Sequence, residues 1–333
     1  MNAIETMNLT KRFGNLIAVD HVSFSVKWNE IFGFLGPNGA GKTTTINMLI
    51  TLMKPTEGEA FVADYNVVEN PEEVRKRIGV VFQDPTLDRH LTGWENLWIH
   101  GRIYGIPKRE LKIRIKEFLE FVELDNWANV QVKNYSGGMM RRLEIARALI
   151  CNPEILFLDE PTLGLDPQTR VKIWDYIVKL KKEMGVTIFL TTHYMEEAEK
   201  LCDKVAIIDY GKIISMGTVN ELKHSIGGEV VYIKTNDANY LAILASKIES
   251  EGFAEKTKII CNEILAVYTK KASETIPMIF DVAQKLKIKV AEITYHIPTL
   301  EDVFLKFTGR RLRDEKVDFF EHFRMSRMRR WRK

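Results

Sequence analysis

Short apolar runs alternate with helically spaced apolar residues through the first 220 residues. The run Ile31–Leu35 is apolar except for its central glycine, which is typical of a buried strand. The stretch Lys42–Met53 instead places Ile46, Leu49, Ile50 and Met53 on one face of a helix. The same patterns predict strands at Val22–Val26, Ile78–Phe82, Ile155–Leu158, Val186–Leu190 and Val205–Asp209, and helices at Pro167–Met184 and Met195–Leu201. This alternation predicts an α/β fold with a parallel sheet covered on both faces.

Residues 92–150 interrupt the alternation with three helical stretches and no convincing strand. The stretches are Thr92–Tyr104, Lys108–Val122 and Gly138–Ile150. We therefore predict a helical subdomain, about residues 90–150, inserted into a first domain of residues 1–226.

A second domain, residues 227–309, is predicted after the boundary near Ile226-Gly227-Gly228. Its strands and helices follow the order βαββαβ, which is the ferredoxin-like arrangement of an α+β domain. The elements are Glu229–Lys234, Ala238–Glu251, Thr257–Cys261, Ile264–Thr269, Ser273–Lys285 and Lys287–Thr294. A closing helix, Thr299–Phe307, precedes a basic tail of residues 310–333.

Composition is that of a soluble globular protein, with 45% hydrophobic and 28% charged residues. The net charge is +3, but the tail from Arg310 to Lys333 is strongly basic. The three cysteines are far apart, so neither a disulfide framework nor a zinc site is predicted, and a reducing cytosol fits best. No run of about 18 apolar residues occurs, so we expect any membrane role to depend on a partner.

The segment GPNGAGKT is a P-loop motif, since it follows an apolar strand and opens a helix. Its glycines allow backbone N–H groups to turn inward on phosphates, Lys42 can reach the β- and γ-phosphates, and the hydroxyl of Thr43 can ligate Mg²⁺. With the next residue, the motif comprises Gly36, Pro37, Asn38, Gly39, Ala40, Gly41, Lys42, Thr43 and Thr44. The alternative is a glycine-rich turn that merely joins a strand to a helix.

Two carboxylates end the apolar run ILFLDEP. Because successive strand residues point to opposite faces, Asp159 and Glu160 should do different work. Asp159 is placed to hold the Mg²⁺ shell, and Glu160 to orient or activate the attacking water. An ordinary acidic turn after a strand is the alternative.

Three further segments are candidates for the same site as the P-loop and the two carboxylates. Ser136, Gly137 and Gly138 precede a helix, so they form either a simple helix cap or a second anion-binding helix start. His193 and Gln83 each follow a strand, and ligands gather at the carboxyl ends of parallel strands. A structural histidine and a solvated amide are the alternatives, and Gln83 could contact Mg²⁺ or water.

Taken in order, these pieces resemble the ATP-binding-cassette (ABC) ATPases over about residues 1–225. They are Phe13, GPNGAGKT, Gln83, SGGM, LDEP, Asp166 and His193. Longer segments resemble the daunorubicin-resistance type of ABC exporter ATPase: GFLGPNGAGKTTTINML, YSGGMMRRLEIARALI, LTTHYMEEAEKLCD and PTLEDVFLKFTG. The last, Pro298–Gly309, links the C-terminal domain to the same type.

The resemblance implies a role for each matched residue around the nucleotide. Phe13 would stack on adenine, although its sequence context fits a core aromatic equally well. Gly36 to Thr44 would hold the phosphates, and Gln83 would sense the γ-phosphate and Mg²⁺. Glu160 would be the catalytic carboxylate, and His193 would contact the γ-phosphate.

The resemblance also implies a head-to-tail homodimer with two ATP molecules between the copies. Ser136 to Gly138 would close over the ATP of the second copy, and Asp166 would lie at the dimer seam. The chain departs from the family pattern at Asn29, Leu163 and Met140, but none of these removes a phosphate or metal ligand.

The expected function is that of an ATPase subunit at the cytoplasmic face of the cell membrane, driving a separate permease for drug or lipophilic-compound efflux. A soluble ABC ATPase acting on nucleic acid is the alternative, with the tail as its phosphate-binding arm. A single cassette without a long coiled-coil insertion argues against it, so no nucleic acid partner is expected. The tail is read either as a solvated end or as a contact with anionic lipid.

Overall fold

The computed structural model describes residues 2–225, 228–235, 237, 239–260, 264–296 and 298–309. The chain divides into two compact units, Met1–Thr218 and Val219–Lys333. The division precedes the predicted boundary near Ile226, because helix α8 (Val219–His224) groups with the second unit. The basic tail, and with it the predicted lipid contact, lies outside the described residues.

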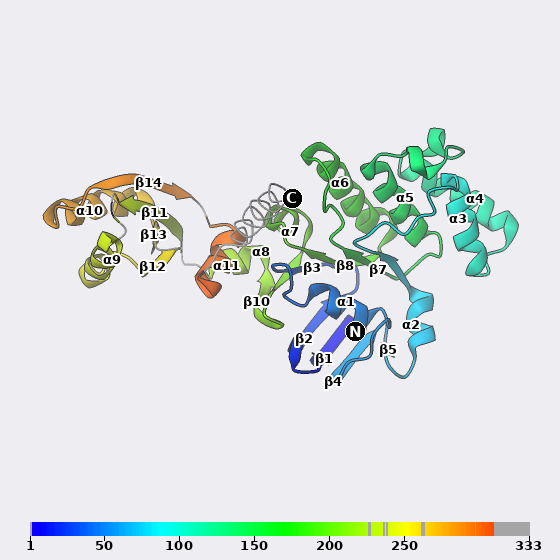
Figure 1. Ribbon diagram of the computed structural model, residues 1–333, viewed down its shortest axis with the longest axis horizontal. Coiled ribbons are helices and arrows are strands. Elements are labelled where there is room, and N and C mark those ends of the chain that lie inside the picture. Colours follow the sequence, from blue (N-terminus) through cyan, green and yellow to red (C-terminus); the bar gives the residue numbers. More distant parts are fainter. Residues whose placement is uncertain are drawn as a thin grey trace, which may run out of the picture. The chain divides into compact units, whose positions relative to one another are not determined.

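A six-stranded sheet forms the centre of the first unit (Figure 1). Its strands are β3 (Ile31–Leu35), β6 (Ile78–Val81), β7 (Ile155–Asp159), β8 (Thr187–Thr192), β9 (Lys204–Asp209) and β10 (Lys212–Thr218). The order is β10-β9-β3-β8-β7-β6; neighbours from β9 to β6 run parallel, and β10 pairs antiparallel with β9. This confirms the predicted parallel sheet, to which the edge strand β10 is an unpredicted addition.

Helices α6 (Pro167–Met184) and α7 (Met195–Leu201) lie on one side of the parallel sheet in Figure 1, and α1 (Lys42–Leu49) lies on the other. Helix α1 ends before the predicted Met53, because Thr51 adopts a left-handed backbone with φ 67°. Asn29, just ahead of β3, also has a positive φ of 59°, which asparagine tolerates better than most residues.

A second, antiparallel sheet packs beside α1, and the sequence pattern predicted only part of it. Its strands are β1 (Asn2–Phe13), β2 (Leu16–Lys27), β4 (Glu57–Val62) and β5 (Tyr65–Asn66), in the order β2-β1-β4-β5. Register shifts between Thr6 and Leu9 and between Leu9 and Lys11 break the alternation of buried and exposed side chains along β1. A period of two residues therefore fails to identify this strand.

Phenylalanine side chains join the two sheets. Phe24 of β2 stacks on Phe32 of β3 with ring centroids 5.3 Å apart, and Phe189 of β8 lies 5.8 Å from Phe24. Phe34 of β3 and Phe157 of β7 also contact Phe189, at 5.7 and 5.6 Å. These rings belong to a buried core that includes Ile46 and other residues of α1, and they fix strands β3, β7 and β8 relative to one another.

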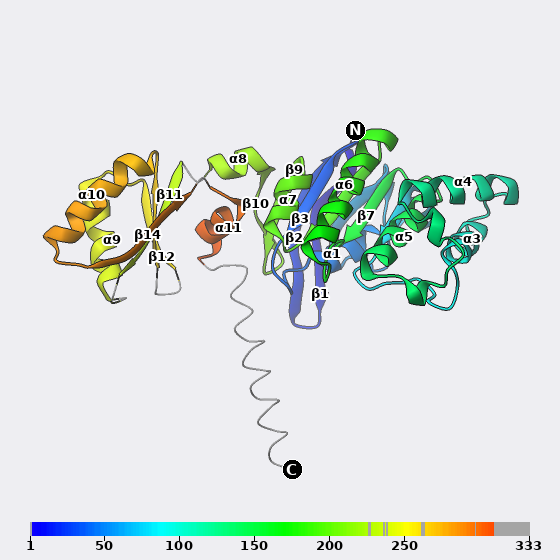
Figure 2. The same cartoon turned by 90° about the horizontal axis from the view of Figure 1, so that it is seen from above.

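The three predicted helices of the inserted block are α3 (Gly93–Ile103), α4 (Lys108–Phe121) and α5 (Gly137–Leu149), and Figures 1 and 2 show them gathered together beside the sheet. Thr92 and Glu95 form a capping box that starts α3. In the described part of residues 92–150, the sole β pairing is an isolated bridge between Thr92 and Gln131. A short helix outside this block, α2 (Pro71–Arg77), was not predicted.

The second unit contains a four-stranded antiparallel sheet with the order β12-β13-β11-β14. Its elements are β11 (Glu229–Thr235), α9 (Asn239–Glu251), β12 (Lys256–Ile260), β13 (Ile264–Thr269), α10 (Ala272–Lys285) and β14 (Val290–His296). This order confirms the ferredoxin-like arrangement. Strand β14 begins later than predicted, because Lys287 has a left-handed backbone with φ 57°, and the predicted strand residue Cys261 lies outside the described residues.

Helix α11 (Leu300–Thr308) is the segment predicted as a closing helix, and polar contacts hold both of its ends. Thr299 and Asp302 form a capping box at its start, and the hydroxyl of Tyr232 on β11 donates to Asp302 Oδ1. At its end, Lys258 Nζ on β12 donates to the carbonyls of Leu305 and Lys306 at 2.9 and 2.8 Å. Asp302 of the PTLEDVF segment therefore both caps the helix and fastens it to the sheet.

Candidate functional site

The P-loop joins β3 to α1, and its glycines are required by close backbone approaches. A Cβ on Gly36 would lie 2.3 Å from the carbonyl oxygen of Ile208, and one on Gly41 would lie 2.4 Å from that of Ala18. Gly41 also has φ 103° and Gly39 has φ 77°, which L side chains rarely adopt. Gly36, Pro37 and Ala40 are buried, whereas Asn38 and Gly39 are exposed at the loop tip, and Thr44 is half-buried.

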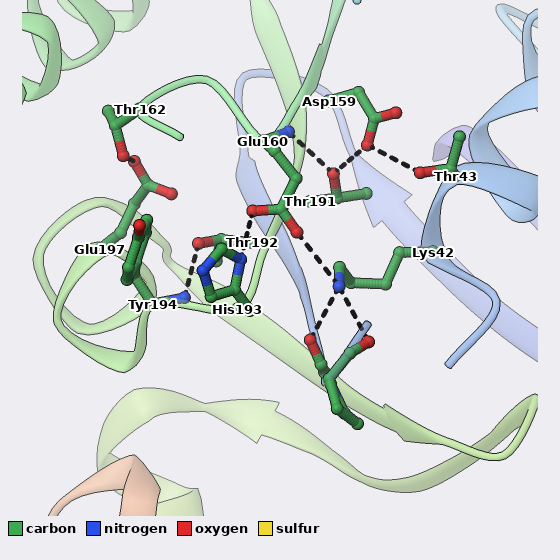
Figure 3. Close-up of polar contacts among 12 residues, drawn as sticks. Lys42, Thr43, Asp159, Glu160, Thr162, Thr191, Thr192, His193, Tyr194 and Glu197 are labelled. Atoms are coloured by element: carbon green, nitrogen blue, oxygen red, sulfur yellow. Dashed lines mark hydrogen bonds and ion pairs between the residues drawn. The ribbon is translucent and has the colours of Figure 1, made fainter. Parts of the chain in front are cut away.

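Lys42 uses all three of its ammonium hydrogens within the site (Figure 3). Its Nζ donates to the carbonyls of Gly36 and Pro37 at 2.8 and 3.0 Å and forms an ion pair with Glu160 Oε1 at 3.1 Å. The side chain is only 5% exposed, so this pairing is only weakly screened by solvent.

Asp159, the last residue of β7, faces two hydroxyl groups. Its Oδ1 accepts a hydrogen bond from Thr191 Oγ1 at 2.5 Å and one from Thr43 Oγ1 at 3.4 Å. Burial raises the pKa of Asp159, against the opposing effect of these two hydroxyl donors. The hydroxyl oxygen of Thr43 and the carboxylate of Asp159 therefore lie close enough together to serve as ligands of one cation.

Glu160 follows β7 and points to different partners from Asp159 (Figure 3). Its φ of 49° is left-handed, so the separation of the two carboxylates comes from a turn of the backbone and not from strand alternation alone. Glu160 Oε2 lies 2.7 Å from His193 Nδ1, which must carry the hydrogen because an ionised carboxylate only accepts. Burial favours a raised pKa for Glu160, but the hydrogen bond from His193 and the charge of Lys42 outweigh it, so the pKa is lowered.

The strands explain why these residues meet. Lys42 follows β3, His193 follows β8 and Glu160 follows β7, and these three strands are adjacent and parallel. Gln83 follows β6, the next strand of the sheet, and its side chain is exposed. Phe13, at the end of β1, is 47% exposed with Lys11 Nζ over its ring, which excludes the core-aromatic alternative.

Ser136, Gly137 and Gly138 form the start of α5. Ser136 Oγ accepts from the backbone N–H of Met139 at 3.2 Å, so the helix-cap interpretation holds, and Ser136 and Gly137 remain exposed. Gly138 is buried against α6, where a Cβ would lie 2.3 Å from Thr169 Cγ2.

Asp166 caps α6 beside this helix start. Its Oδ1 accepts from the backbone N–H of Thr169 at 3.0 Å, and its Oδ2 accepts from Thr169 Oγ1 at 2.6 Å. Most of the predicted site residues thus form two groups, one around Lys42 and Glu160 and one at the starts of α5 and α6. Among the contacts of the described residues, none joins Phe13 or Gln83 to either group.

Two buried charged residues near the site were not singled out from the sequence. Arg141 on α5 donates to backbone carbonyls around the Asp159–Glu160 turn. Glu197 on α7 accepts from Thr162 Oγ1 at 2.7 Å and from Trp174 Nε1 at 2.9 Å, and burial raises its pKa. Both lie in amphipathic helices whose charged residues ordinarily face solvent, so the sequence pattern carries no signal for them.

Two family models match the chain. The model described as "ABC transporter" matches residues 19–163, and the model described as "ATP-binding protein DrrA1-3-like, C-terminal domain" matches residues 217–308. The two matches cover much of the first unit and most of the second.

Similar proteins extend over nearly the whole chain. The chain is 40% identical over 298 residues to the doxorubicin resistance ATP-binding protein DrrA of Mycobacterium tuberculosis, covering 89% of each. It is 40% identical over 311 residues to the Nod factor export ATP-binding protein I of Ralstonia nicotianae, covering 92% of this chain and 94% of that protein. Its fold is similar to a dimeric ATP-binding cassette in a post-hydrolysis state with ADP and Pi, at TM-score 0.59 and 31% identity over 65% of this chain and 98% of that one.

Proposed function

Because the chain belongs to the ATP-binding-cassette (ABC) transporter family, we propose that its P-loop site is one half of a composite ATPase site completed by a second copy. The chain is an ATP-binding and ATP-hydrolysing subunit of an ABC exporter, which works with a separate membrane permease. The observation that carries the proposal is the cluster of Lys42, Glu160 and His193 at adjacent strand ends.

ATP binding exchanges the partners of Lys42. Since all three ammonium hydrogens are engaged, the lysine gives up at least one bond to reach the phosphates, and the ion pair to Glu160 is the one a phosphate best replaces. Glu160 is then free to accept the proton of the water that attacks the γ-phosphorus, while the bond to the β-phosphate oxygen breaks. His193 holds Glu160 through Nδ1, which leaves Nε2 for the γ-phosphate.

Thr43 and Asp159 would hold Mg²⁺, with Gln83 as a further oxygen ligand. The donors fit, because Mg²⁺ prefers hydroxyl, carboxylate and carbonyl oxygens, and Thr43 Oγ1 lies 3.4 Å from Asp159 Oδ1. The described residues contain no group of three or more His, Cys, Asp or Glu suited to a metal. The ion would take its other ligands from phosphates and water. When bound, the ion would supply charge neutralisation at the phosphates.

The second copy would supply Ser136 and Gly137. Both are exposed at a helix start that offers free backbone N–H groups to an anion. A two-fold axis would pair each P-loop with the helix start of the other copy, with Asp166 at the seam and Phe13 against adenine.

Mixing two inactive variants tests the composite site. Lys42→Ala disables the P-loop, and Gly137→Asp places a negative charge at the helix start, where a Cβ meets only ordinary contact with Leu165 at 3.5 Å. A mixed pair contains one intact site, so an equimolar mixture should recover about a quarter of the wild-type rate, given random pairing and independent sites. Recovery of nothing, with both variants folded and associating, would contradict a head-to-tail pair.

The permease would dock on the helical block and the loop of residues 84–92, at the cytoplasmic face of the membrane. Helix α3 exposes Ile99 and Ile103, and Tyr104 directly after it is exposed as well; Ile103 is 76% exposed. No helix in the described ranges is long and apolar enough to cross a membrane. Ile103→Asp should reduce co-purification with membranes containing the permease, whereas Ile243→Asp, on the exposed face of α9 in the second unit, should not. Equal loss in both variants would argue against this surface.

The cargo we propose is a drug or another lipophilic compound, in keeping with the doxorubicin resistance protein among the relatives. The basic tail would add contact with anionic lipid, since each cation near such a surface gains about 1 kcal/mol. Binding of the full chain to anionic but not neutral liposomes, weakened by salt and absent after truncation at Gly309, would support this contact. Binding that salt leaves unchanged would contradict it.

A further inference from the structure

Arg141 on α5 is buried, and each of its five N–H groups has an acceptor. Its Nε donates to the carbonyl of Pro161 at 2.7 Å, and its Nη2 donates to those of Asp159 at 3.1 Å and Glu160 at 2.8 Å. Its Nη1 donates to the carbonyl of Phe82 at 2.5 Å and to Glu144 Oε2 at 3.1 Å.

The four carbonyl acceptors belong to two catalytic segments. Asp159, Glu160 and Pro161 form the turn that carries both carboxylates, and its backbone at Glu160 is left-handed. Phe82 is the residue immediately before Gln83. One guanidinium group on α5, the helix that Ser136 caps, therefore holds the Glu160 turn and the start of the Gln83 loop together.

The same helix also fixes the beginning of the following loop. Glu144 Oε1 accepts from the backbone N–H of Thr86 at 2.8 Å, and Arg147 Nη1 donates to the carbonyl of Thr86 at 2.9 Å. Glu144 is buried as well, so the pair with Arg141 is shielded from solvent. A buried ion pair is weak evidence of added stability, because desolvation offsets its attraction, and a positioning role is a better account of its presence.

We propose that Arg141 is a positioning residue for ATP hydrolysis, which couples the helix start at Ser136 to the carboxylate of Glu160 and to the Gln83 loop. This inference rests on the proposed catalytic role of Glu160. When the helix start engages the ATP of a second copy, α5 carries the Glu160 turn and the loop after Gln83 with it. Arginine is needed because its planar group reaches four carbonyls on two separate segments, which the compact ammonium of lysine cannot do.

The test is Arg141→Lys, with Arg142→Lys as the matched control. Arg142 is the next residue, and it donates to the carbonyl of Val122 at 2.8 Å, away from both catalytic segments. Arg141→Lys should lower kcat about tenfold to a hundredfold, because a misplacement of about 1 Å has effects of that size, and it should leave KM for ATP within about threefold. Arg142→Lys should keep the wild-type kcat.

A second readout separates positioning from a general folding defect. In a Glu160→Gln background, Arg141→Lys should still bind ATP and associate, since the P-loop and Ser136 are untouched. If Arg141→Lys does not fold, Glu144→Gln serves as the test instead. This substitution keeps the shape of the side chain but removes the charge that pairs with Arg141. It should also lower kcat.

Three results would overturn the inference: a wild-type kcat in Arg141→Lys, loss of ATP binding in that variant, or a wild-type kcat in Glu144→Gln. Glu160→Gln alone distinguishes this failure from that of the proposed function. If Glu160→Gln hydrolyses ATP normally, the proposed function fails; if it is inactive while Arg141→Lys is normal, only the inference fails.

Discussion

Replacing Gly138 by alanine should destabilise the first unit through one identifiable contact. The new Cβ would lie 2.3 Å from Thr169 Cγ2, whereas two carbon atoms normally approach to about 3.5 Å or more. Thr169 is poorly able to yield, because Asp166 holds both its backbone N–H and its hydroxyl, at 3.0 and 2.6 Å. The clash must therefore move helix α5 or α6.

Two opposing effects set the magnitude. Overpacking of this kind costs about 1–3 kcal/mol, and alanine is favoured over glycine in a helix by at most about 1 kcal/mol. The free energy of unfolding should therefore fall by about 1 kcal/mol. Thr169→Ser removes the methyl group that clashes and keeps the hydroxyl for Asp166. In that background Gly138→Ala should become neutral or stabilising.

A double-mutant cycle measures this reversal of sign. Urea unfolding followed by tryptophan fluorescence suits the test, because every tryptophan except Trp331 lies in the first unit. The coupling between the two substitutions should be about 1–3 kcal/mol. Additivity to within about 0.5 kcal/mol, or stabilisation by Gly138→Ala alone, would refute the reasoning.

Three further predictions concern the site and its surroundings. Glu160→Gln should lower kcat at least about a hundredfold in a steady-state ATPase assay while retaining ATP binding, and equal loss of binding would contradict a catalytic role. Thr43→Val should raise the Mg²⁺ concentration needed for half-maximal hydrolysis about tenfold or more, whereas Thr43→Ser, which keeps the hydroxyl, should not. Burial raises the folded-state pKa of Glu197 above its unfolded value, so its contribution to stability is present at low pH and is lost as pH rises through the folded pKa. The difference in Tm between wild type and Glu197→Gln should accordingly change with pH, and a constant difference would exclude that effect.

The sequence predicted those parts of the fold in which local pattern and tertiary environment agree. Strands β3, β7 and β8 are buried on both faces and read as apolar runs, and the P-loop and LDEP residues follow them directly. Strand β1 was missed because its register shifts move side chains out of alternation. The ferredoxin-like order could be predicted because helices α9 and α10 each bury one apolar stripe.

The residues of the site could be predicted from the sequence more readily than the contacts between them. The pattern placed Glu160 after a strand, but its left-handed backbone and its pairing with both Lys42 and His193 depend on three segments far apart in the chain. Arg141 and Glu197 were missed for the same reason. Each is buried by partners on other elements, and nothing in its own helix distinguishes it from a surface charge.

The phenylalanine cluster has a consequence for engineering and for evolutionary drift. Phe32 and Phe34, Phe157 and Phe189 lie on the strands whose ends carry the P-loop, the two carboxylates and His193. A substitution that loosens these rings would shift the strand ends as well, so thermal tolerance and turnover would decline together. Directed-evolution libraries aimed at new activity should therefore spare these positions.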